Sequence, residues 1–416
     1  MHSGDKQAGP EAARAEWRAY WPLTLAALIG YSTIGLQSYG IGPFVPHLEK
    51  AFGWTRTDVM IGLSLSNAVG VFLNILIGMI VDRFGPRRVA LTGLLVKTGS
   101  FALLATATGT LLNWSLLWVV LAVGVVLVQS TVWTSAVAAR FDHSRGLAMA
   151  VALSGTPITA AVVPVLATWL IGDYGWRVGF VGVAAAWIVV TLPVVFLWFK
   201  DGRDPAQPLH AAATGPVSGL TLREGLRTAA FWRLLVAFGA FSLYNMAMSA
   251  NLVPLLGETG LSEMQAARIA SVMGLVGIVA RLTVGFLLDR FSGPLIGGLT
   301  QFLPVIACGI LLLHDPGVLL LTVAVALFGV ATGAEIDVAL YLATRHFGLR
   351  SFAALFGAVI TFGAVNAAIG PIVAGWLHDR SGNYDGLLMT VMVAMTVGAL
   401  AMATMGRPKH DWRAAG

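Results

Sequence analysis

Long apolar runs follow one another along the whole chain, and short segments rich in glycine, proline or charge separate them. A helix rises about 1.5 Å per residue and needs about 20 apolar residues to cross a bilayer, so each run is long enough to span a membrane. The sequence therefore predicts an all-α membrane protein with twelve transmembrane helices. The predicted helices cover residues 18–45, 57–81, 88–108, 111–138, 146–171, 178–199, 229–256, 264–288, 294–313, 317–344, 350–377 and 385–405.

The composition narrows the possible functions. Of the 416 residues, 57% are hydrophobic and only 11% are charged, whereas a soluble domain carries about 25% charged residues. The spans leave no room for a soluble catalytic domain, and the sequence has neither a phosphate-binding loop nor a zinc-binding pair of histidines. Its single cysteine, Cys308, excludes an intramolecular disulfide. We therefore predict no enzymatic activity, no cofactor, no metal site, no nucleic-acid partner and no obligatory protein partner.

Basic residues are distributed unevenly over the connections. If both ends of the chain lie on one side of the membrane, that side receives 19 of the 26 Lys and Arg residues, and the other side receives five. Cytoplasmic loops carry the excess of Lys and Arg in membrane proteins. The first apolar run is too long for a cleavable signal core. These features predict a multi-pass protein of the cell inner (plasma) membrane, with both termini in the cytoplasm and a retained first helix.

The sequence divides into two similar halves. The longest connection is rich in Pro, Ala, Gly and charge, which is typical of a linker. Two separate clusters recur after the same offset of 207 positions, which indicates a duplication. Gly78, Asp82, Arg83 and Phe84 recur as Gly285, Asp289, Arg290 and Phe291, and Pro164, Trp169 and Leu170 recur as Pro371, Trp376 and Leu377. The predicted organisation is a cytoplasmic tail (1–17), a six-helix half (18–199), a cytoplasmic linker (200–228), a second six-helix half (229–405) and a cytoplasmic tail (406–416).

A dense motif of glycine and charge, GMIVDRFGPRR at residues 78–88, follows the second predicted helix. It resembles the G-x-x-x-D-R-x-G-x-R-R signature of the major facilitator superfamily at every position. Glycine permits close helix approach and tight turns at such a site. The resemblance implies two pseudo-symmetric six-helix halves, alternating access, and a gating charge network. The residues expected in this gating motif are Gly78, Asp82, Arg83, Gly85, Arg87, Asp289 and Arg290.

Further segments resemble the monocarboxylate porter family within that superfamily. They are FGWTR at residues 52–56, RGLAMA at 145–150, and the end of the eleventh helix from Gly370 to Tyr384. Arg281, Gly285 and Asp289 also follow the family's R-x-x-x-G-x-x-x-D pattern, in which the arginine binds the substrate carboxylate. Several animal members carry an aspartate four residues before that arginine. Gly277 stands there in this chain, so proton coupling through that acid is not carried over.

Charged residues within spans are the main candidates for transport, because such charges are costly unless they are paired or face water. Arg281 lies about 12 Å inside the eighth helix, where Gly277 and Gly285 are expected to clear space for a ligand. Glu335 and Asp337 are the acids within a span, and their spacing places them on different helix faces. Asp337 is the favoured proton carrier, and Glu335 is the second candidate. The third possibility is that neither acid carries the proton.

The second cation within a span is Lys97, on the third helix, which is peripheral in the resembled fold. Its ammonium is expected to snorkel to the cytoplasmic interface. Polar and aromatic residues on the helices expected to line the cavity complete the candidate substrate site. These residues are Tyr31, Tyr39, Gln129, Trp133, Tyr244, Asn245, Tyr341 and Asn366.

The combined features predict a secondary active transporter of small organic anions. The expected substrate is a monocarboxylate, and the expected coupling is proton symport by alternating access. The alternatives are efflux or proton-independent exchange of amphipathic or aromatic compounds, and a receptor that reuses the transporter fold. The segment Ser154-Gly155-Thr156-Pro157 lacks the glycine-rich pattern that marks the fifth helix of drug/proton antiporters, which counts against efflux.

Overall fold

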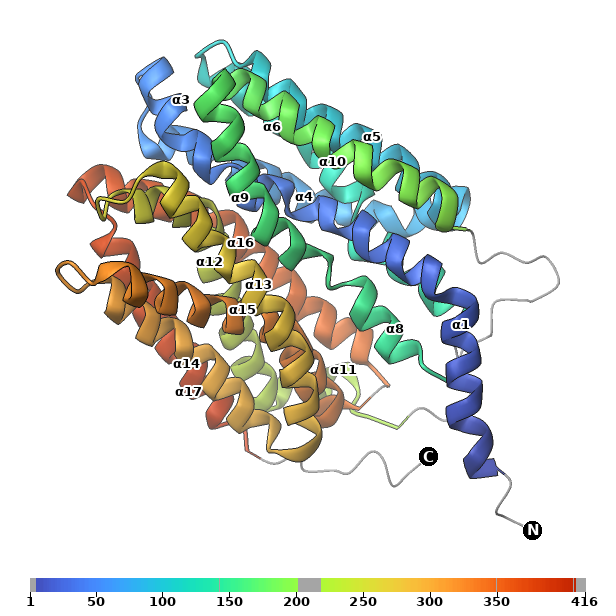
Figure 1. Ribbon diagram of the computed structural model, residues 1–416. Coiled ribbons are helices and arrows are strands. Elements are labelled where there is room, and N and C mark those ends of the chain that lie inside the picture. The colour runs from blue at the N-terminus through green and yellow to red at the C-terminus, as the bar shows by residue number, and fades with distance from the viewer. Residues whose placement is uncertain (1–4, 142, 201–217, 349, 407, 409–416) are drawn as a thin grey trace.

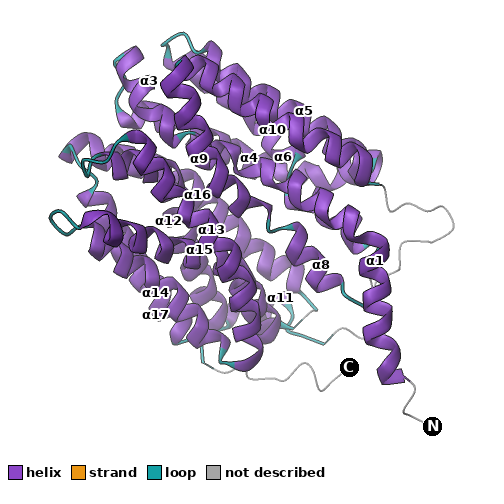
Figure 2. Cartoon of the chain, viewed as in Figure 1, coloured by secondary structure: helices purple, strands orange, loops and turns teal. Residues whose placement is uncertain are grey.

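The computed structural model describes residues 5–141, 143–200, 218–348, 350–406 and 408. In these residues the chain is helical apart from its loops and one isolated bridge between Gly219 and Gly348 (Figure 2). The first half contains α1 (Asp5–Ser32), α2 (Leu36–Gly40), α3 (Val45–Phe52), α4 (Arg56–Phe84), α5 (Pro86–Leu103), α6 (Leu111–Leu127), α7 (Ser130–Ala138), α8 (Arg145–Ala152), α9 (Gly155–Tyr174) and α10 (Trp176–Trp198). The second half contains α11 (Leu222–Arg227), α12 (Ala229–Gly257), α13 (Glu263–Arg290), α14 (Gly293–Leu311), α15 (Gly317–Phe347), α16 (Phe352–Ser381) and α17 (Asp385–Ala403).

The predicted spans are found in the structure. Among the described residues, ten helical segments are long and apolar enough to cross a bilayer, and an eleventh is formed if α4, which bends by 60° near Asn74, is counted as one span. From the second predicted helix onward, each span begins and ends within four residues of its predicted limits. The fourth and fifth spans are each interrupted, at the junctions α6–α7 and α8–α9.

The first span differs from its prediction at both ends. Its helix α1 begins at Asp5 and not near residue 18, because the polar segment before the membrane is rich in Ala, Glu and Arg, which are strong helix formers that hydropathy does not detect. Glu16 in this extension accepts hydrogen bonds from the backbone N–H groups of His143 (2.9 Å) and Ser144 (3.1 Å), just before α8. The helix ends at Ser32, and short helical turns continue the span to Phe44. Residues 1–4 of the predicted tail lie outside the described residues.

The predicted linker is described only in part. Residues 201–217 lie outside the described residues, and the remainder contains the short helix α11. Thr221 caps this helix, and the hydrogen bonds from its backbone N–H and its hydroxyl lower the pKa of Glu224. Of the predicted tail after residue 405, only Gly406 and Pro408 are described.

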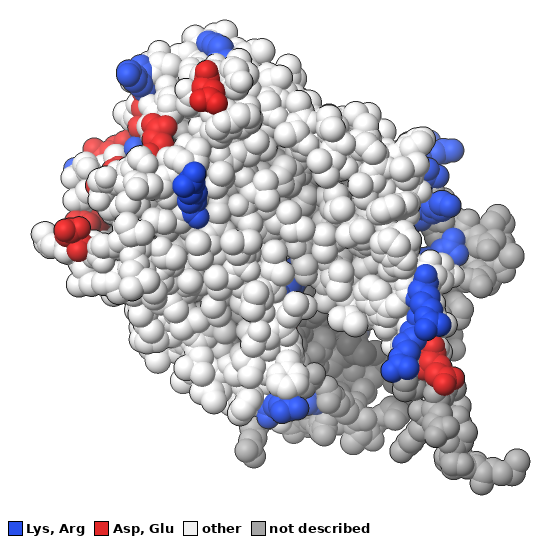
Figure 3. Space-filling model, viewed as in Figure 1, with Lys and Arg blue, Asp and Glu red and all other residues white. Residues whose placement is uncertain are grey.

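The two halves meet along two pairs of helices. Helix α9 packs along α13, and α4 packs along α16, so each contact joins the first half to the second (Figure 1). We call the face where α1 begins and α17 ends the terminal face, and the opposite face, where α3 leads to α4 and α16 leads to α17, the distal face. Most of the visible charged side chains lie near two opposite ends of the molecule, and a broad uncharged band separates them (Figure 3). This band suits the apolar interior of a bilayer.

Candidate functional site

An ion pair lies within the membrane-spanning part of the second half. Arg281 on α13 and Asp337 on α15 are paired with 3.1 Å between Nε and Oδ2, and Nη2 donates a long hydrogen bond of 3.4 Å to Oδ1. The Arg281 side chain is 9% exposed and that of Asp337 is 24% exposed. The Arg281 Nε–H is nevertheless a buried donor without an acceptor in hydrogen-bonding geometry among the described residues. The pair is therefore incompletely satisfied and partly open to solvent.

A close contact between two helices positions this pair. A Cβ atom on Gly333 would lie 2.3 Å from the carbonyl oxygen of Gly277, so α15 and α13 approach each other at a point that admits no side chain. Arg281 and Asp337 each follow one of these glycines by four residues, which places both side chains one helical turn beyond the contact. Gly277 itself is not crowded: a Cβ atom there would meet the Gly329 carbonyl oxygen at 3.4 Å and the Pro157 side chain at 3.8 Å. Gly285 has open space around it, as expected.

Arg281 also reaches across to the first half. Its Nη1 donates a hydrogen bond of 2.8 Å to the backbone carbonyl of Leu153, which lies at the junction of α8 and α9. Tyr31 on α1 lies within Coulombic range of the same guanidinium. The structure thus gathers groups from both halves around Arg281.

Several predicted substrate-site residues continue from Tyr31 toward the distal face. Tyr39 lies near Tyr31 and the Ser249 hydroxyl. That hydroxyl contacts the Asn245 side-chain oxygen at 3.1 Å. Tyr244 is fully buried and donates to the backbone carbonyl of Phe328 at 3.3 Å. The first and second halves therefore bring Tyr31, Tyr39 and Asn245 into one polar series.

Other predicted substrate-site residues lie elsewhere. Trp133 is fully buried within the first half, where its Nε1 donates to the Val128 carbonyl at 2.9 Å and its ring fills the space above Gly30. Gln129 immediately precedes α7, at the break in the fourth span. Tyr341 packs over Gly293, at the start of α14.

The last predicted substrate-site residue, Asn366, lies on α16. Its amide donates to the Phe362 carbonyl of its own helix at 2.9 Å. The amide nitrogen also lies close to Gly239 on α12, where a Cβ atom would approach it to 3.3 Å.

The second acid within a span, Glu335, points away from this site. It is 1% exposed and accepts a 2.8 Å hydrogen bond from the Gln301 amide, which comes from α14. The same amide donates to the Ala237 carbonyl on α12 at 3.0 Å. Glu335 therefore faces neighbouring helices, as its position on α15 predicts.

The expectation for Lys97 is wrong. Its side chain does not reach an interface: the residue is 0% exposed, and its Nζ donates to the side-chain oxygen of Gln37 on α2. Gly124 on α6 packs directly against its backbone. Lys97 points inward because the broken first span presents an amide oxygen to it, and the sequence gives no sign of that contact.

The gating motif lies at the terminal face. Asp82 and Arg83 are exposed, and Gly78 has nothing within 4 Å of the position that a Cβ would occupy. Gly85 adopts the positive φ of 81° that its turn requires. The Arg87 Nη2 donates to the Phe196 carbonyl on α10 at 2.8 Å. Arg290 lies over the Phe286 ring at 4.2 Å, and the side chain of Asp289 lies outside the described residues.

Polar contacts join the halves at the distal face, and sequence reasoning missed them. The Asp379 carboxylate on α16 accepts hydrogen bonds from the backbone N–H groups of Arg56 and Thr57, each at 2.9 Å, and so caps the first turn of α4. The Arg56 side chain pairs with Glu49 and donates to the Tyr384 hydroxyl. Burial raises the pKa of Tyr384, and its hydroxyl donates to the Asn251 side-chain oxygen at 3.1 Å. The halves are thus closed against each other at the distal face.

Phe72 on α4 and Phe362 on α16, which lie nearer the terminal face than the contacts just described, are exposed. The structure therefore represents a state that is closed at the distal face.

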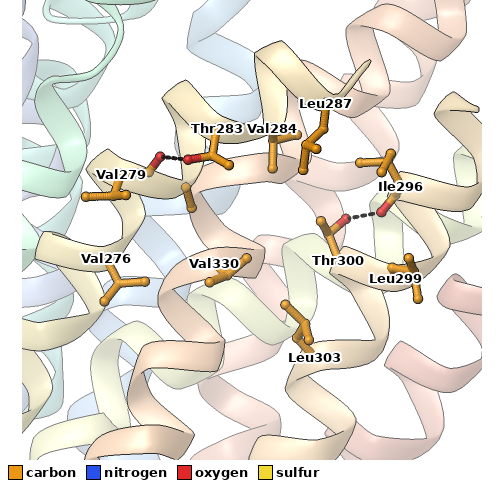
Figure 4. A pocket seen from close by; sticks show the side chains of 11 residues that line it. Val276, Val279, Thr283, Val284, Leu287, Ile296, Leu299, Thr300, Leu303 and Val330 are labelled. Carbon is orange, nitrogen blue, oxygen red and sulfur yellow. Dashed lines mark hydrogen bonds between the residues drawn. The ribbon is translucent and has the colours of Figure 1, made fainter. Parts of the chain in front are cut away.

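A separate cavity of about 300 Å³ lies between α13, α14 and α15 (Figure 4). Its lining is apolar, and its two hydroxyls, from Thr283 and Thr300, are hydrogen-bonded to carbonyls of their own helices. Among the described residues no charged group lines it, and Val279 and Leu299 in its lining are exposed. This cavity does not provide the chemistry that an anionic ligand needs. No group of His, Cys, Asp and Glu in the described ranges could hold a metal ion.

Two helical halves packed around buried charge at mid-membrane depth define a membrane transporter. The sequence matches the model of the Major Facilitator Superfamily over residues 27–371. The protein therefore belongs to the major facilitator superfamily, and the predicted fold class is confirmed. The family and its relatives are transporters, which are not enzymes.

The similarity extends to individual proteins. The chain is 25% identical over 400 residues to monocarboxylate transporter 13 of Bos taurus, which covers 92% of this chain and 89% of the relative. It is 29% identical over 409 residues to a chloramphenicol resistance protein of Streptomyces lividans, covering 94% and 99%. In fold it is similar to a bacterial homologue of the human lysosomal transporter Spinster in an inward-facing and occupied conformation, with a TM-score of 0.66, 17% identity and 94% of each chain covered. The resemblance to monocarboxylate transporters is thereby confirmed.

Proposed function

We propose that this transporter carries small organic anions, with monocarboxylates as substrates, by proton-coupled symport across the cell inner membrane. The terminal face lies in the cytoplasm, and the structure represents the inward-facing empty carrier. One observation supports this proposal most strongly. Arg281 is a buried guanidinium between the two halves: it pairs with Asp337 of the second half at 3.1 Å and donates to the Leu153 carbonyl of the first half at 2.8 Å. Guanidinium matches the planar geometry of a carboxylate, so a monocarboxylate suits this donor set.

The coupling follows from the charge of the site. In the empty carrier, Arg281 and Asp337 together carry no net charge. A bound monocarboxylate adds one negative charge, and a proton on Asp337 removes one, so the doubly loaded site is neutral again. A site loaded with the proton or the substrate alone carries a net charge, which costs several kcal/mol within a bilayer. Only the empty and the doubly loaded carriers can therefore change state readily. The substrate and the proton must then cross together in the same direction, which is symport.

Asp337 is the preferred proton carrier because it contacts both Arg281 and solvent. Protonation of Asp337 weakens its pairing with Arg281, and the substrate carboxylate then binds to the guanidinium. Rocking of the halves then opens the site to the other side. Glu335 is the second candidate, because it is a buried acid that contacts one amide.

Uptake into proteoliposomes tests the proposal. Labelled short-chain, hydroxy, dicarboxylic and aromatic acids are supplied outside, with an inward proton gradient, with a membrane potential alone, and with neither. We expect the proton gradient to drive uptake of monocarboxylates and the potential alone to have no effect, since the loaded site is neutral. Potential-driven uptake would contradict the neutral cycle, and the absence of uptake for every acid would contradict the substrate class.

Asp337→Asn separates net transport from exchange. Asparagine resembles protonated aspartate, so the empty variant carries the uncompensated charge of Arg281, while the substrate-loaded variant is neutral. We expect proton-driven net uptake to fall at least about 100-fold, because several kcal/mol oppose the return of the empty carrier. Exchange of internal for external monocarboxylate should persist. The measurement compares net uptake with counterflow in the same vesicles.

Glu335→Gln is the matched control for that variant. It removes the other buried acid and keeps a group that can accept the Gln301 hydrogen bond. We expect it to retain net uptake. If Glu335→Gln loses net uptake and Asp337→Asn retains it, Glu335 is the proton carrier. If both variants retain proton-driven uptake, neither acid carries the proton.

Efflux of amphipathic compounds is the second candidate function. The similarity to the chloramphenicol resistance protein, which spans 99% of that relative, supports it. Efflux predicts that chloramphenicol or similar compounds, and not acids, leave vesicles or cells in a manner that depends on the protein. Lower accumulation of chloramphenicol in cells that express the carrier, with no acid uptake in vesicles, would favour this function over symport.

A further inference from the structure

The backbone carbonyl of Leu153 lacks its usual helical partner. In a continuous helix this carbonyl would accept the N–H of the residue four positions later, but that residue is Pro157, which has no N–H. The fifth span is accordingly interrupted here, between the end of α8 at Ala152 and the start of α9 at Gly155. The free carbonyl accepts the hydrogen bond of 2.8 Å from Arg281.

This hydrogen bond joins the two halves where they begin to separate. A Cβ atom on Gly274 would lie 2.3 Å from both the Pro157 carbonyl oxygen and the Ala161 nitrogen, so α13 and α9 touch backbone to backbone just beyond the junction. On the other side of the junction, α8 packs on α1 and α7. Closing the terminal face would bring α8 toward α13 and change the position of the Leu153 carbonyl relative to Arg281.

The N–H groups of Arg281 contact acceptors of different strength. The contact with Asp337 joins two charges, whereas the Leu153 carbonyl is neutral and therefore a weaker acceptor than a carboxylate. An incoming carboxylate exchanges most readily with the neutral acceptor. This exchange frees Nη1 from the Leu153 carbonyl. Binding of a carboxylate at Arg281 therefore also breaks the hydrogen bond between the halves.

We propose that the Leu153 carbonyl, released by Pro157, occupies the substrate-binding donor of Arg281 in the empty carrier and holds the halves in the inward-facing state until a carboxylate displaces it. This inference rests on the proposed role of Arg281 and extends it. Leu153 and Pro157 are positioning residues: they act through Arg281 and link occupancy of the site to the contact between α9 and α13.

Pro157→Ala tests the proposal, because alanine supplies the missing N–H and gives the Leu153 carbonyl a helical partner. Pro164→Ala is the matched control, since Pro164 also lies inside α9 and is buried there. The full chain carries Cys308→Ala and one spin label in each half, at the exposed distal positions Lys50 and Arg268. Distances between the labels report the populations of the two states in the absence of any acid.

We expect Pro157→Ala to raise the ratio of outward-facing to inward-facing carrier by about tenfold or more, because it weakens a hydrogen bond from a charged group. Pro164→Ala should leave the ratio unchanged. Arg281→Lys, which keeps the charge but not the planar fork, should cause a similar shift, and adding Pro157→Ala to it should cause little more. Equal shifts from both proline variants, no shift from Pro157→Ala, or additive shifts with Arg281→Lys would overturn the proposal.

Acetate separates this inference from the proposed function. At saturating acetate, the wild-type distances should move toward those of ligand-free Pro157→Ala, and the variant itself should change little. A shift in Pro157→Ala without acid, together with no response of the wild type to acetate, would support the inter-half bond and overturn its displacement by carboxylates. If Pro157→Ala does not fold, Pro157→Ser, which also restores the N–H, takes its place in every comparison.

Discussion

Arg281→Gln is expected to reduce proton-driven monocarboxylate uptake at least about 100-fold. Glutamine removes the cation that pairs with the substrate, and it leaves the Asp337 carboxylate partly buried without its partner. Truncating one member of a buried charge pair costs about 3–5 kcal/mol, and a substrate anion meets the same missing charge. The measurement is initial uptake at fixed carrier density in proteoliposomes, over a range of substrate concentrations.

Two controls separate transport from folding in that experiment. Arg281→Gln combined with Asp337→Asn removes both charges, so it should recover the thermal stability of the purified carrier without recovering uptake. Arg268→Gln removes an exposed cation at the distal face and should leave uptake within about twofold of wild type, since surface charges contribute little. Normal uptake by Arg281→Gln would refute the carboxylate role.

Gly333→Ala is expected to damage both stability and transport, although it adds only one methyl group. The new Cβ would lie 2.3 Å from the Gly277 carbonyl, and backbone atoms on both sides cannot move aside as a side chain can. Overpacking of this kind costs about 1–3 kcal/mol. We expect a lower thermal unfolding temperature and a loss of uptake of at least about tenfold, because separating α15 from α13 also misaligns Asp337 and Arg281.

Gly285→Ala is the matched control for that prediction. It lies on α13 with nothing within 4 Å of a Cβ, and alanine is the better helix former, so stability should be unchanged or slightly increased. Unchanged stability and uptake in Gly333→Ala would mean that the contact between α13 and α15 does not position the ion pair.

The helical membrane fold could be predicted because the length and apolarity of a membrane-spanning helix are properties of its own sequence. The structure differs from the prediction where hydropathy does not determine the local conformation. Helix α1 extends to Asp5 through helix-forming polar residues, which a hydropathy window cannot register. The break at Leu153 follows from Pro157, which was visible in the sequence, although its consequence for Arg281 depends on how the halves pack.

The candidate site was predictable at the level of residues but not of contacts. Charges are rare within spans, so Arg281, Asp337 and Glu335 stood out, and helix geometry correctly separated the faces of the two acids. Their partners lie on other helices, and a single sequence does not reveal which helices are neighbours. The same limitation explains the wrong expectation for Lys97, whose partner Gln37 lies 60 residues earlier in the chain. It also concealed the contact between Arg56 and Asp379, which are 323 residues apart.

The cap that Asp379 places on α4 has a consequence for how readily the protein can change shape. This contact is polar and lies at the rim, where the Asp379 side chain is exposed to water. When the halves part, water can replace each hydrogen bond that the carboxylate and the first turn of α4 give up, so little enthalpy is lost. Water could not replace the contacts of an apolar seal in this way. Placing exchangeable polar contacts at the seam keeps the two shapes close in free energy, and a carrier requires this because each shape must be populated in every cycle.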